Sequence, residues 1–178
     1  MSARQIMDRV AVERALRRIA HEIVEKNRGT DDLMLVGIAR RGEPLAKRLA
    51  MLLTAIEDRP QAVPAFGLDI GPWRDDRPGA PRGPLPFSAA GRVVVLVDDV
   101  IWTGRSARAG LDAITATGRP RRVQLAVLVD RGHRELPIRP DFVGKNLPTA
   151  SDERVQVRLS EVDPMEDGVY VMPWQARS

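Results

Sequence analysis

The stretch Val93–Ser106 constrains the fold and chemistry of this chain more than any other. Five apolar residues, Val93–Val97, predict a buried strand, and they end at the adjacent carboxylates Asp98 and Asp99. Thr103–Ser106 (Thr-Gly-Arg-Ser) follow, and then a helical pattern begins. Such a loop offers backbone N–H groups, hydroxyls and a positive helix end to a phosphate, while the carboxylates can hold ribose hydroxyls or a metal ion. The stretch therefore predicts a sugar-phosphate site; a buried strand that merely ends in acids would not need Thr-Gly-Arg-Ser at this offset.

The composition is that of a globular chain with a large apolar fraction. Hydrophobic residues make up 43% of the 178 positions, enough for the core of one domain, residues 1–178. The absence of cysteine excludes a disulfide framework and a thiolate metal site, and it fits a reducing cytoplasm. No apolar stretch has signal-peptide length at the start, and the longest apolar run, Val93–Val97, is too short for a membrane span. We therefore expect a cytoplasmic protein with no membrane partner.

Arginine carries almost all of the positive charge. The net charge is +4, and lysine occurs only at positions 26, 47 and 145. A guanidinium is planar and binds phosphate through two nitrogens, so this composition permits a polyanionic partner. Codon bias in a GC-rich genome would produce the same excess, so only the placement of the arginines separates the two interpretations.

The order of apolar and amphipathic segments predicts an α/β fold, a twisted, mostly parallel sheet flanked by helices, with a C-terminal β-hairpin. The proline-rich segment Gly71–Ala90 predicts an exposed, mobile loop, either an active-site lid or a plain linker. The expected helices are 8–27, Glu43–Ala55 and Ser106–Thr117, and the expected strands are Leu33–Ile38, Ala62–Leu68, Val93–Val97, Arg122–Val129, Arg154–Val162 and Val169–Met172.

Polar loops follow three of these strands, at the sheet edge where α/β proteins bind ligands. They are Ala39–Gly42, Asp98–Ser106 and Asp130–Arg134. A pyrophosphate, a ribose 5-phosphate and a base would each need one such loop. Arginine and glycine in the first loop suit pyrophosphate.

Two sets of residues carry a resemblance to known families. Val93–Ser106 resembles the phosphoribosyl-pyrophosphate (PRPP) motif of the type I phosphoribosyltransferases. The run Val129–Arg139, together with Arg17–Glu22 and Leu68–Ile70 followed by Trp73–Asp76, is similar to the PyrR family of bacterial pyrimidine operon regulators. This second resemblance extends from about Val12 to Val162. It implies a type I phosphoribosyltransferase-like fold and a uracil phosphoribosyltransferase that converts uracil and PRPP to UMP and pyrophosphate.

The resemblance also implies roles for residues and a Mg²⁺ cofactor, held indirectly by Asp98 and Asp99. The implied catalytic residues are Asp98, Asp99, Arg41 and Arg74, and the implied uracil-binding residues are Val129, Asp130 and Arg131. Trp73, Trp102 and Trp174 could stack bases. The implied PRPP- and nucleotide-binding residues are Arg40, Arg41, Gly42, Asp98, Asp99, Val100, Ile101, Trp102, Thr103, Gly104, Arg105 and Ser106.

A second implied role is binding to the leader of pyrimidine mRNA when UMP or UTP occupies the site, which attenuates transcription. The helix 8–27 supports it independently, because Arg14, Arg17, Arg18 and His21 fall on one face at helical spacing. A solvated helix face is the simpler interpretation. The implied RNA-binding residues are Arg14, Arg17, Arg18, His21, Lys26, His133, Arg134, Arg139 and Lys145.

The sequence departs from the family pattern at Arg17, Lys26, Arg40, Gly71–Trp73 and Trp102, while the PRPP motif is intact. Three hypotheses remain open: a bifunctional enzyme and regulator, a phosphoribosyltransferase without RNA binding, and a nucleotide-sensing regulator with little catalysis. The family implies a homo-oligomer, a dimer or larger.

Overall fold

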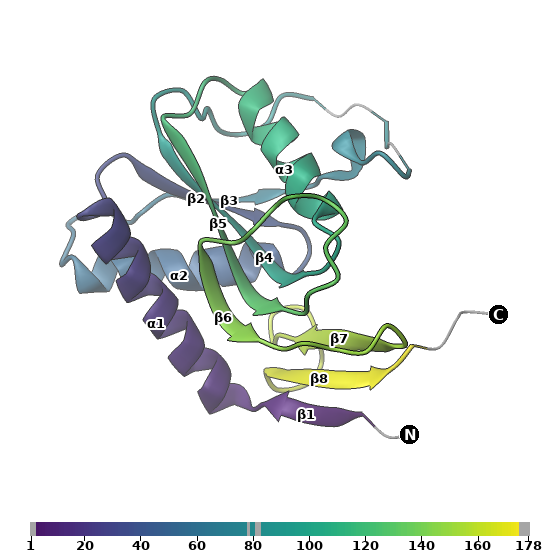
Figure 1. Ribbon diagram of the computed structural model, residues 1–178. Helices are drawn as coiled ribbons and strands as arrows, with labels where there is room; N and C mark the ends of the chain where they lie inside the picture. The colour runs from purple at the N-terminus through teal and green to yellow at the C-terminus, as the bar shows by residue number, and fades with distance from the viewer. Residues whose placement is uncertain (1–2, 78, 81–82, 175–178) are drawn as a thin grey trace.

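Five parallel strands form the centre of the molecule in the order β3-β2-β4-β5-β6 (Figure 1). The computed structural model describes residues 3–77, 79–80 and 83–174. The longest strands, β4 and β5, lie side by side in the middle, with Val97 opposite Ala126. The strands are β2 (Leu33–Ile38), β3 (Ala65–Leu68), β4 (Val93–Ile101), β5 (Arg122–Asp130) and β6 (Phe142–Asn146).

Helices cover both faces of this sheet. Helices α1 (Arg9–Asn27) and α2 (Gly42–Ile56) pack on one face, where Val93, Val95 and Val97 contribute to the core. Helix α3 (Arg105–Ala116) packs on the other face against Val94 and Leu96. Alternate residues of β4 therefore enter two separate apolar layers, which explains the continuous apolar run of this strand.

A second, antiparallel sheet lies beyond the arrowheads of β5 and β6 (Figure 1). It has the order β1-β8-β7, with β1 (Arg4–Met7), β7 (Glu153–Arg158) and β8 (Gly168–Pro173). The strands β7 and β8 form the predicted C-terminal hairpin. This sheet stands next to the carboxyl ends of the parallel strands, so it can supply side chains to a ligand site there.

The fold class predicted from the sequence is confirmed, with differences in detail. Strand β4 continues through the two carboxylates to Ile101, and β3 begins only at Ala65. Strand β7 ends at Arg158, short of the predicted Val162, because the Asp163 carboxylate accepts the Leu159 N–H and turns the chain. Strands β1 and β6 were not predicted.

Most of the described residues of the segment Gly71–Ala90 are exposed, as predicted, but parts of it pack against the fold. It begins with the short 3₁₀ helix η1 (Gly71–Trp73), and near its end Ala89 is fully buried. The Phe87 ring lies 5.3 Å from that of Phe66. Pro78 and Pro81 lie outside the described residues. In the described part of the chain, no helix is long and apolar enough to cross a membrane.

Candidate functional site

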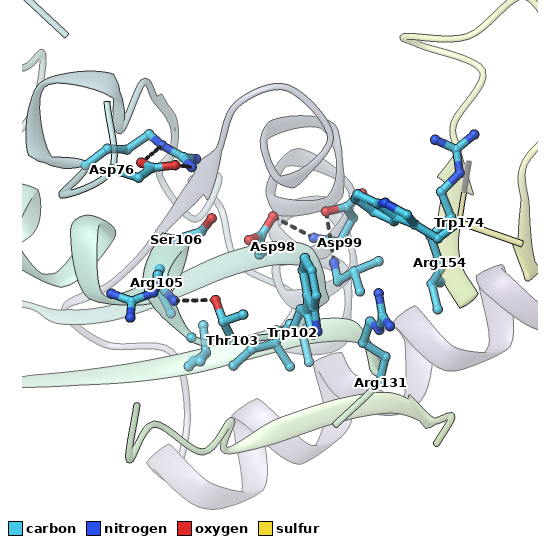
Figure 2. Close-up of a pocket in the computed structure, with 18 residues that line it drawn as sticks. Asp76, Asp98, Asp99, Trp102, Thr103, Arg105, Ser106, Arg131, Arg154 and Trp174 are labelled. Carbon is cyan, nitrogen blue, oxygen red and sulfur yellow. Dashed lines mark hydrogen bonds and ion pairs between the residues drawn. The ribbon is translucent and has the colours of Figure 1, made fainter. Parts of the chain in front are cut away.

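A cavity of about 470 Å³ opens at the carboxyl end of β4, beside the second sheet (Figure 2). Figure 2 shows Arg105 and Ser106 at one end, Asp98 and Asp99 in the middle, and Arg154 and Trp174 at the other end. Its lining is Arg74, Asp76, Asp98–Ala107, Leu125, Val127, Arg131, Arg154, Val155 and Trp174. The structure thus brings all of the predicted Asp98–Ser106 segment to one cavity.

The loop before α3 presents its donors to the cavity. The Thr103 carbonyl accepts the N–H groups of Glu135 (2.9 Å) and Leu136 (3.1 Å), and the Trp102 carbonyl accepts Nη1 of Arg134 (2.9 Å). Gly104, with φ of 93°, turns the chain into the helix. The Arg105 N–H donates to Thr103 Oγ1 (3.4 Å), and the positive end of α3 lies at this cavity, where it favours an anion.

Asp98 and Asp99 place two carboxylates at the floor of the cavity. Oδ1 of Asp98 accepts the Asp99 N–H and Oδ1 of Asp99 accepts the Val100 N–H, both at 2.9 Å. Burial, and then the charge of Asp99, raises the pKa of Asp98 well above its usual range; burial also raises the pKa of Asp99. The charge of Arg41 opposes the effect of burial on Asp99. A buried pair of carboxyl groups favours hydroxyl donors or a cation.

Carboxylate oxygens are ligands that suit Mg²⁺. Among the described residues, no group of three or more acidic, histidine or cysteine side chains could hold a metal. The donor set therefore fits a cation that takes its remaining ligands from water and a bound phosphate compound, as Mg²⁺ commonly does.

A second cavity, of about 420 Å³, adjoins the first and shares Arg74, Asp98–Val100 and Ser106 with it. Its other wall is the loop after β2, which includes Arg40 and Arg41, and the bond between Ala39 and Arg40 is cis. Gly42 does not line it but allows the loop to approach β4, because a Cβ there would collide with the Val97 carbonyl. Two cavities therefore meet at the acidic pair.

The two arginines predicted to face pyrophosphate are held differently. Arg41 binds Asp163, in the loop between β7 and β8, through Nη2 (2.7 Å) and Nε (3.3 Å). Arg40 is exposed.

Arg74 lines both cavities, but its guanidinium pairs with Asp76 at 2.6 and 2.8 Å and lowers the pKa of that carboxyl to about 2. Asp75 in turn binds Arg105 at 2.7 Å.

The predicted uracil residues divide between two sides of β5. Arg131 lines the first cavity, and its Nε and Nη2 donate to Thr149 Oγ1 (3.1 Å) and the Glu153 carbonyl (2.8 Å). Val129 is fully buried, and Asp130 binds Arg134 at 2.7 Å, so neither lines that cavity. Sequence reasoning did not select Arg154, which comes from the second sheet and has no motif to mark it.

The predicted RNA-binding residues lie on two adjoining elements, α1 and the segment 131–146. Arg18 joins them by donating to the carbonyls of Val143 (3.2 Å) and Gly144. Arg18 also pairs with Glu22. Three others are engaged: Lys26 with Asp141, His133 with the Thr149 carbonyl, and Arg134 as described above. The remaining five are exposed and have no partner among the described residues: Arg14, Arg17, His21, Arg139 and Lys145.

Comparisons with known proteins agree on this architecture. Residues 2–160 match the phosphoribosyl transferase domain family. The bifunctional protein PyrR of Roseiflexus sp. (strain RS-1) is 55% identical over 186 aligned positions, which cover 100% of both chains. The bifunctional protein PyrR of Pelotomaculum thermopropionicum is 57% identical, covering 91% of this chain and 92% of its own. The crystal structure of HGPRT-ase from Leishmania tarentolae in complex with GMP has a similar fold, with a TM-score of 0.71, 20% identity and coverage of 98% and 99%.

Proposed function

The chain belongs to the phosphoribosyl transferase domain family and to the PyrR group within it, and from this we propose a function for the two joined cavities. The protein is a uracil phosphoribosyltransferase that converts uracil and PRPP to UMP and pyrophosphate. It also regulates the pyrimidine operon by binding the mRNA leader when a uridine nucleotide occupies the same site. The observation that carries the enzyme assignment is the pair Asp98 and Asp99 at the junction of the two cavities.

PRPP has a 5-phosphate and a pyrophosphate on opposite sides of one ribose, and the site has the same order of parts. The N–H groups of Thr103–Ser106 receive the 5-phosphate, and Asp98 and Asp99 hold the ribose hydroxyls. The second cavity receives the pyrophosphate beside Arg40 and Arg41. Uracil enters at the far end of the first cavity, beside Arg131.

The transfer needs positioning and charge stabilisation more than a nucleophile from the protein. As the bond to pyrophosphate breaks, positive charge develops on the ribose ring, and the adjacent carboxylates of Asp98 and Asp99 stabilise it. Arg41 and Arg74 stabilise the negative charge of the leaving group. Uracil held against the ribose then forms the C1′–N1 bond in place of the broken C1′–O bond, and the N1 proton passes to the departing pyrophosphate or to water. Little freedom is lost in this step, because both reactants are already oriented.

Mg²⁺ is the cofactor that the donor set fits. Asp98 and Asp99 would hold it indirectly, through water and the ribose and phosphate oxygens of PRPP. When bound, it would neutralise charge on the pyrophosphate.

The RNA surface consists of α1 and the segment 131–146. The side chains of Arg14, Arg17 and His21 are exposed, have no partner in the part of the chain that the structure describes, and can contact phosphate. Arg139 and Lys145 extend the same surface from the neighbouring segment. Arg134 connects it to the nucleotide site, because it binds the Trp102 carbonyl in the cavity loop and Asp130 below it. A bound nucleotide can therefore alter the RNA surface through one side chain.

Three further properties belong to this proposal. The whole chain is one domain, because a single apolar cluster contains residues of α1, of the parallel sheet and of the hairpin β7–β8. The protein acts in the cytoplasm, where its substrate and mRNA are found. It assembles as a homo-oligomer.

Pyrophosphate release from PRPP in the presence of Mg²⁺ tests the enzyme assignment, with uracil, cytosine, hypoxanthine and guanine offered in turn. We expect release with uracil alone. Release with none of the bases would contradict catalysis and favour a sensor, and failure of UMP to promote leader RNA binding would favour an enzyme without RNA binding.

A further inference from the structure

At the base end of the first cavity, two tryptophans from different sheets lie together. Trp102 follows β4 and Trp174 follows β8, and their ring centroids are 6.0 Å apart with an angle of 48° between the planes. Both line the cavity, and 41% of Trp102 and 53% of Trp174 remain exposed. Exposed aromatic rings that line a cavity are typical of ligand recognition rather than of core packing.

A buried arginine fixes the first of these rings. The guanidinium carbon of Arg131 lies 4.7 Å from the centroid of the Trp102 ring, and Arg131 is only 4% exposed. Its Nε and Nη2 are bonded to Thr149 and Glu153, so the group cannot move freely. Arg131, Trp102 and Trp174 therefore lie in series along the cavity, with Arg131 over the Trp102 ring and the two indole planes tilted against each other; they are here called the tryptophan stack.

The position of the stack decides which part of a nucleotide it would meet. With the phosphate at the N-terminus of α3 and the ribose at Asp98 and Asp99, the base points toward the end where Figure 2 shows Trp174 and Arg154. We propose that Trp174, supported by Trp102 and Arg131, is the residue that stacks on the base of the bound nucleotide, so that a side chain of the small sheet determines base affinity. This inference rests on the proposed function, because it assumes uracil as the base.

The proposal has a specific consequence for ligands with and without a base. Removing an aromatic ring that stacks on a base weakens the affinity for the ligand by about 5- to 100-fold. A ligand that lacks the base would be unaffected. The backbone N–H of residue 174 donates to the Asp152 carbonyl (2.6 Å), and this bond does not depend on the ring. Replacing Trp174 should therefore leave the strand end in place.

Calorimetric titration of the full chain with UMP and with ribose 5-phosphate tests the inference, using wild type, Trp174→Ala and Trp174→Phe. We expect Trp174→Ala to bind UMP about 5- to 100-fold more weakly, Trp174→Phe to recover most of the loss, and all three proteins to bind ribose 5-phosphate equally. Trp73→Phe is the matched control, because Trp73 does not line this cavity. UMP should quench the fluorescence of that variant but quench Trp174→Phe much less.

Two results would overturn the inference: unchanged UMP affinity in Trp174→Ala, or an equal loss for UMP and ribose 5-phosphate, which would indicate a general structural defect. If the wild type binds ribose 5-phosphate but not UMP, the proposed uracil specificity is contradicted, and so is the inference that Trp174 stacks on the base. The two failures are thus distinguished by the wild-type titration.

Discussion

Nη2 of Arg41 lies 2.7 Å from Oδ1 of Asp163, which joins the loop after β2 to the loop between β7 and β8. The pair is largely buried, with 27% and 16% of the two side chains exposed. Nearby, Arg48 of α2 binds Glu161 and Asp167 in the same loop. Two arginines therefore attach the small sheet to the pyrophosphate side of the site, and Asp163 sets the direction of the Arg41 guanidinium.

Removing Arg41 should weaken PRPP binding more than removing Asp163. We expect Arg41→Ala to raise the KM for PRPP about tenfold to a hundredfold, because a charge-assisted hydrogen bond contributes about 1.5–3 kcal/mol. Asp163→Asn, which keeps an oxygen to accept the Leu159 N–H but removes the charge that pairs with Arg41, should have a smaller effect. The double variant should resemble Arg41→Ala, because the charge of Asp163 acts through Arg41. Steady-state kinetics of the four proteins measure this. Additive effects in the double variant would show that Asp163 has an independent role.

Asp76 holds the guanidinium of Arg74 beside both cavities, so it would compete with pyrophosphate for that group. We expect Asp76→Asn to lower the KM for PRPP about two- to fivefold, because exposed ion pairs are worth at most about 1 kcal/mol and the variant removes a competitor. Asp31→Asn is the matched control, since Asp31 pairs with Arg59 away from both cavities. A raised KM in Asp76→Asn would mean that the pair helps to position Arg74 instead.

The raised pKa of Asp98 has a consequence for stability. In the folded state this carboxyl keeps its proton to higher pH than in the unfolded chain, so the free energy of unfolding falls as pH rises above the usual carboxyl pKa of about 4. Asp98→Asn should remove part of this fall and stabilise the ligand-free protein by about 1 kcal/mol at neutral pH. The same change should reduce kcat about a hundredfold or more.

Urea unfolding between pH 4 and pH 8 measures the stability change, with Asp112→Asn as an exposed control. Equal pH dependence in the wild type and Asp98→Asn would contradict the assigned cause, which is burial of the carboxyl next to Asp99.

The structure separates free from engaged cations on the RNA surface. Arg17 is exposed without a partner among the described residues, so Arg17→Ala should weaken leader RNA binding, reduce its salt dependence by about one phosphate contact and leave stability unchanged. Arg134 makes three hydrogen bonds, so Arg134→Ala should destabilise the fold by about 1–3 kcal/mol. Filter binding at several salt concentrations and thermal unfolding compare them. A loss of stability in Arg17→Ala would contradict the distinction.

Local patterns predicted the strand–loop–helix unit of β4 and α3 well, because its apolar run, acids and glycine lie within Val93–Ser106. Strand β6 escaped prediction because only Phe142 in it is fully buried and its end is polar and exposed. The four-residue strand β1 is mostly exposed, and it is a strand because it pairs with β8. The contacts of Arg41 with Asp163 and of Trp102 with Trp174 join segments that are distant in the sequence, so local sequence patterns could not predict them.

The central claim is that one cavity serves both catalysis and regulation. Leader RNA binding, titrated with UMP in the wild type and in Ser106→Ala, tests it most directly. Ser106 lines the cavity at the end where the phosphate is proposed to bind, and it is not one of the residues of the RNA surface. We predict that UMP tightens RNA binding by the wild type, and that Ser106→Ala needs more UMP by the same factor by which its own UMP affinity falls. Two results would contradict the claim. In one, UMP does not change the RNA affinity of the wild type. In the other, Ser106→Ala binds UMP more weakly but needs no more UMP than the wild type to tighten RNA binding.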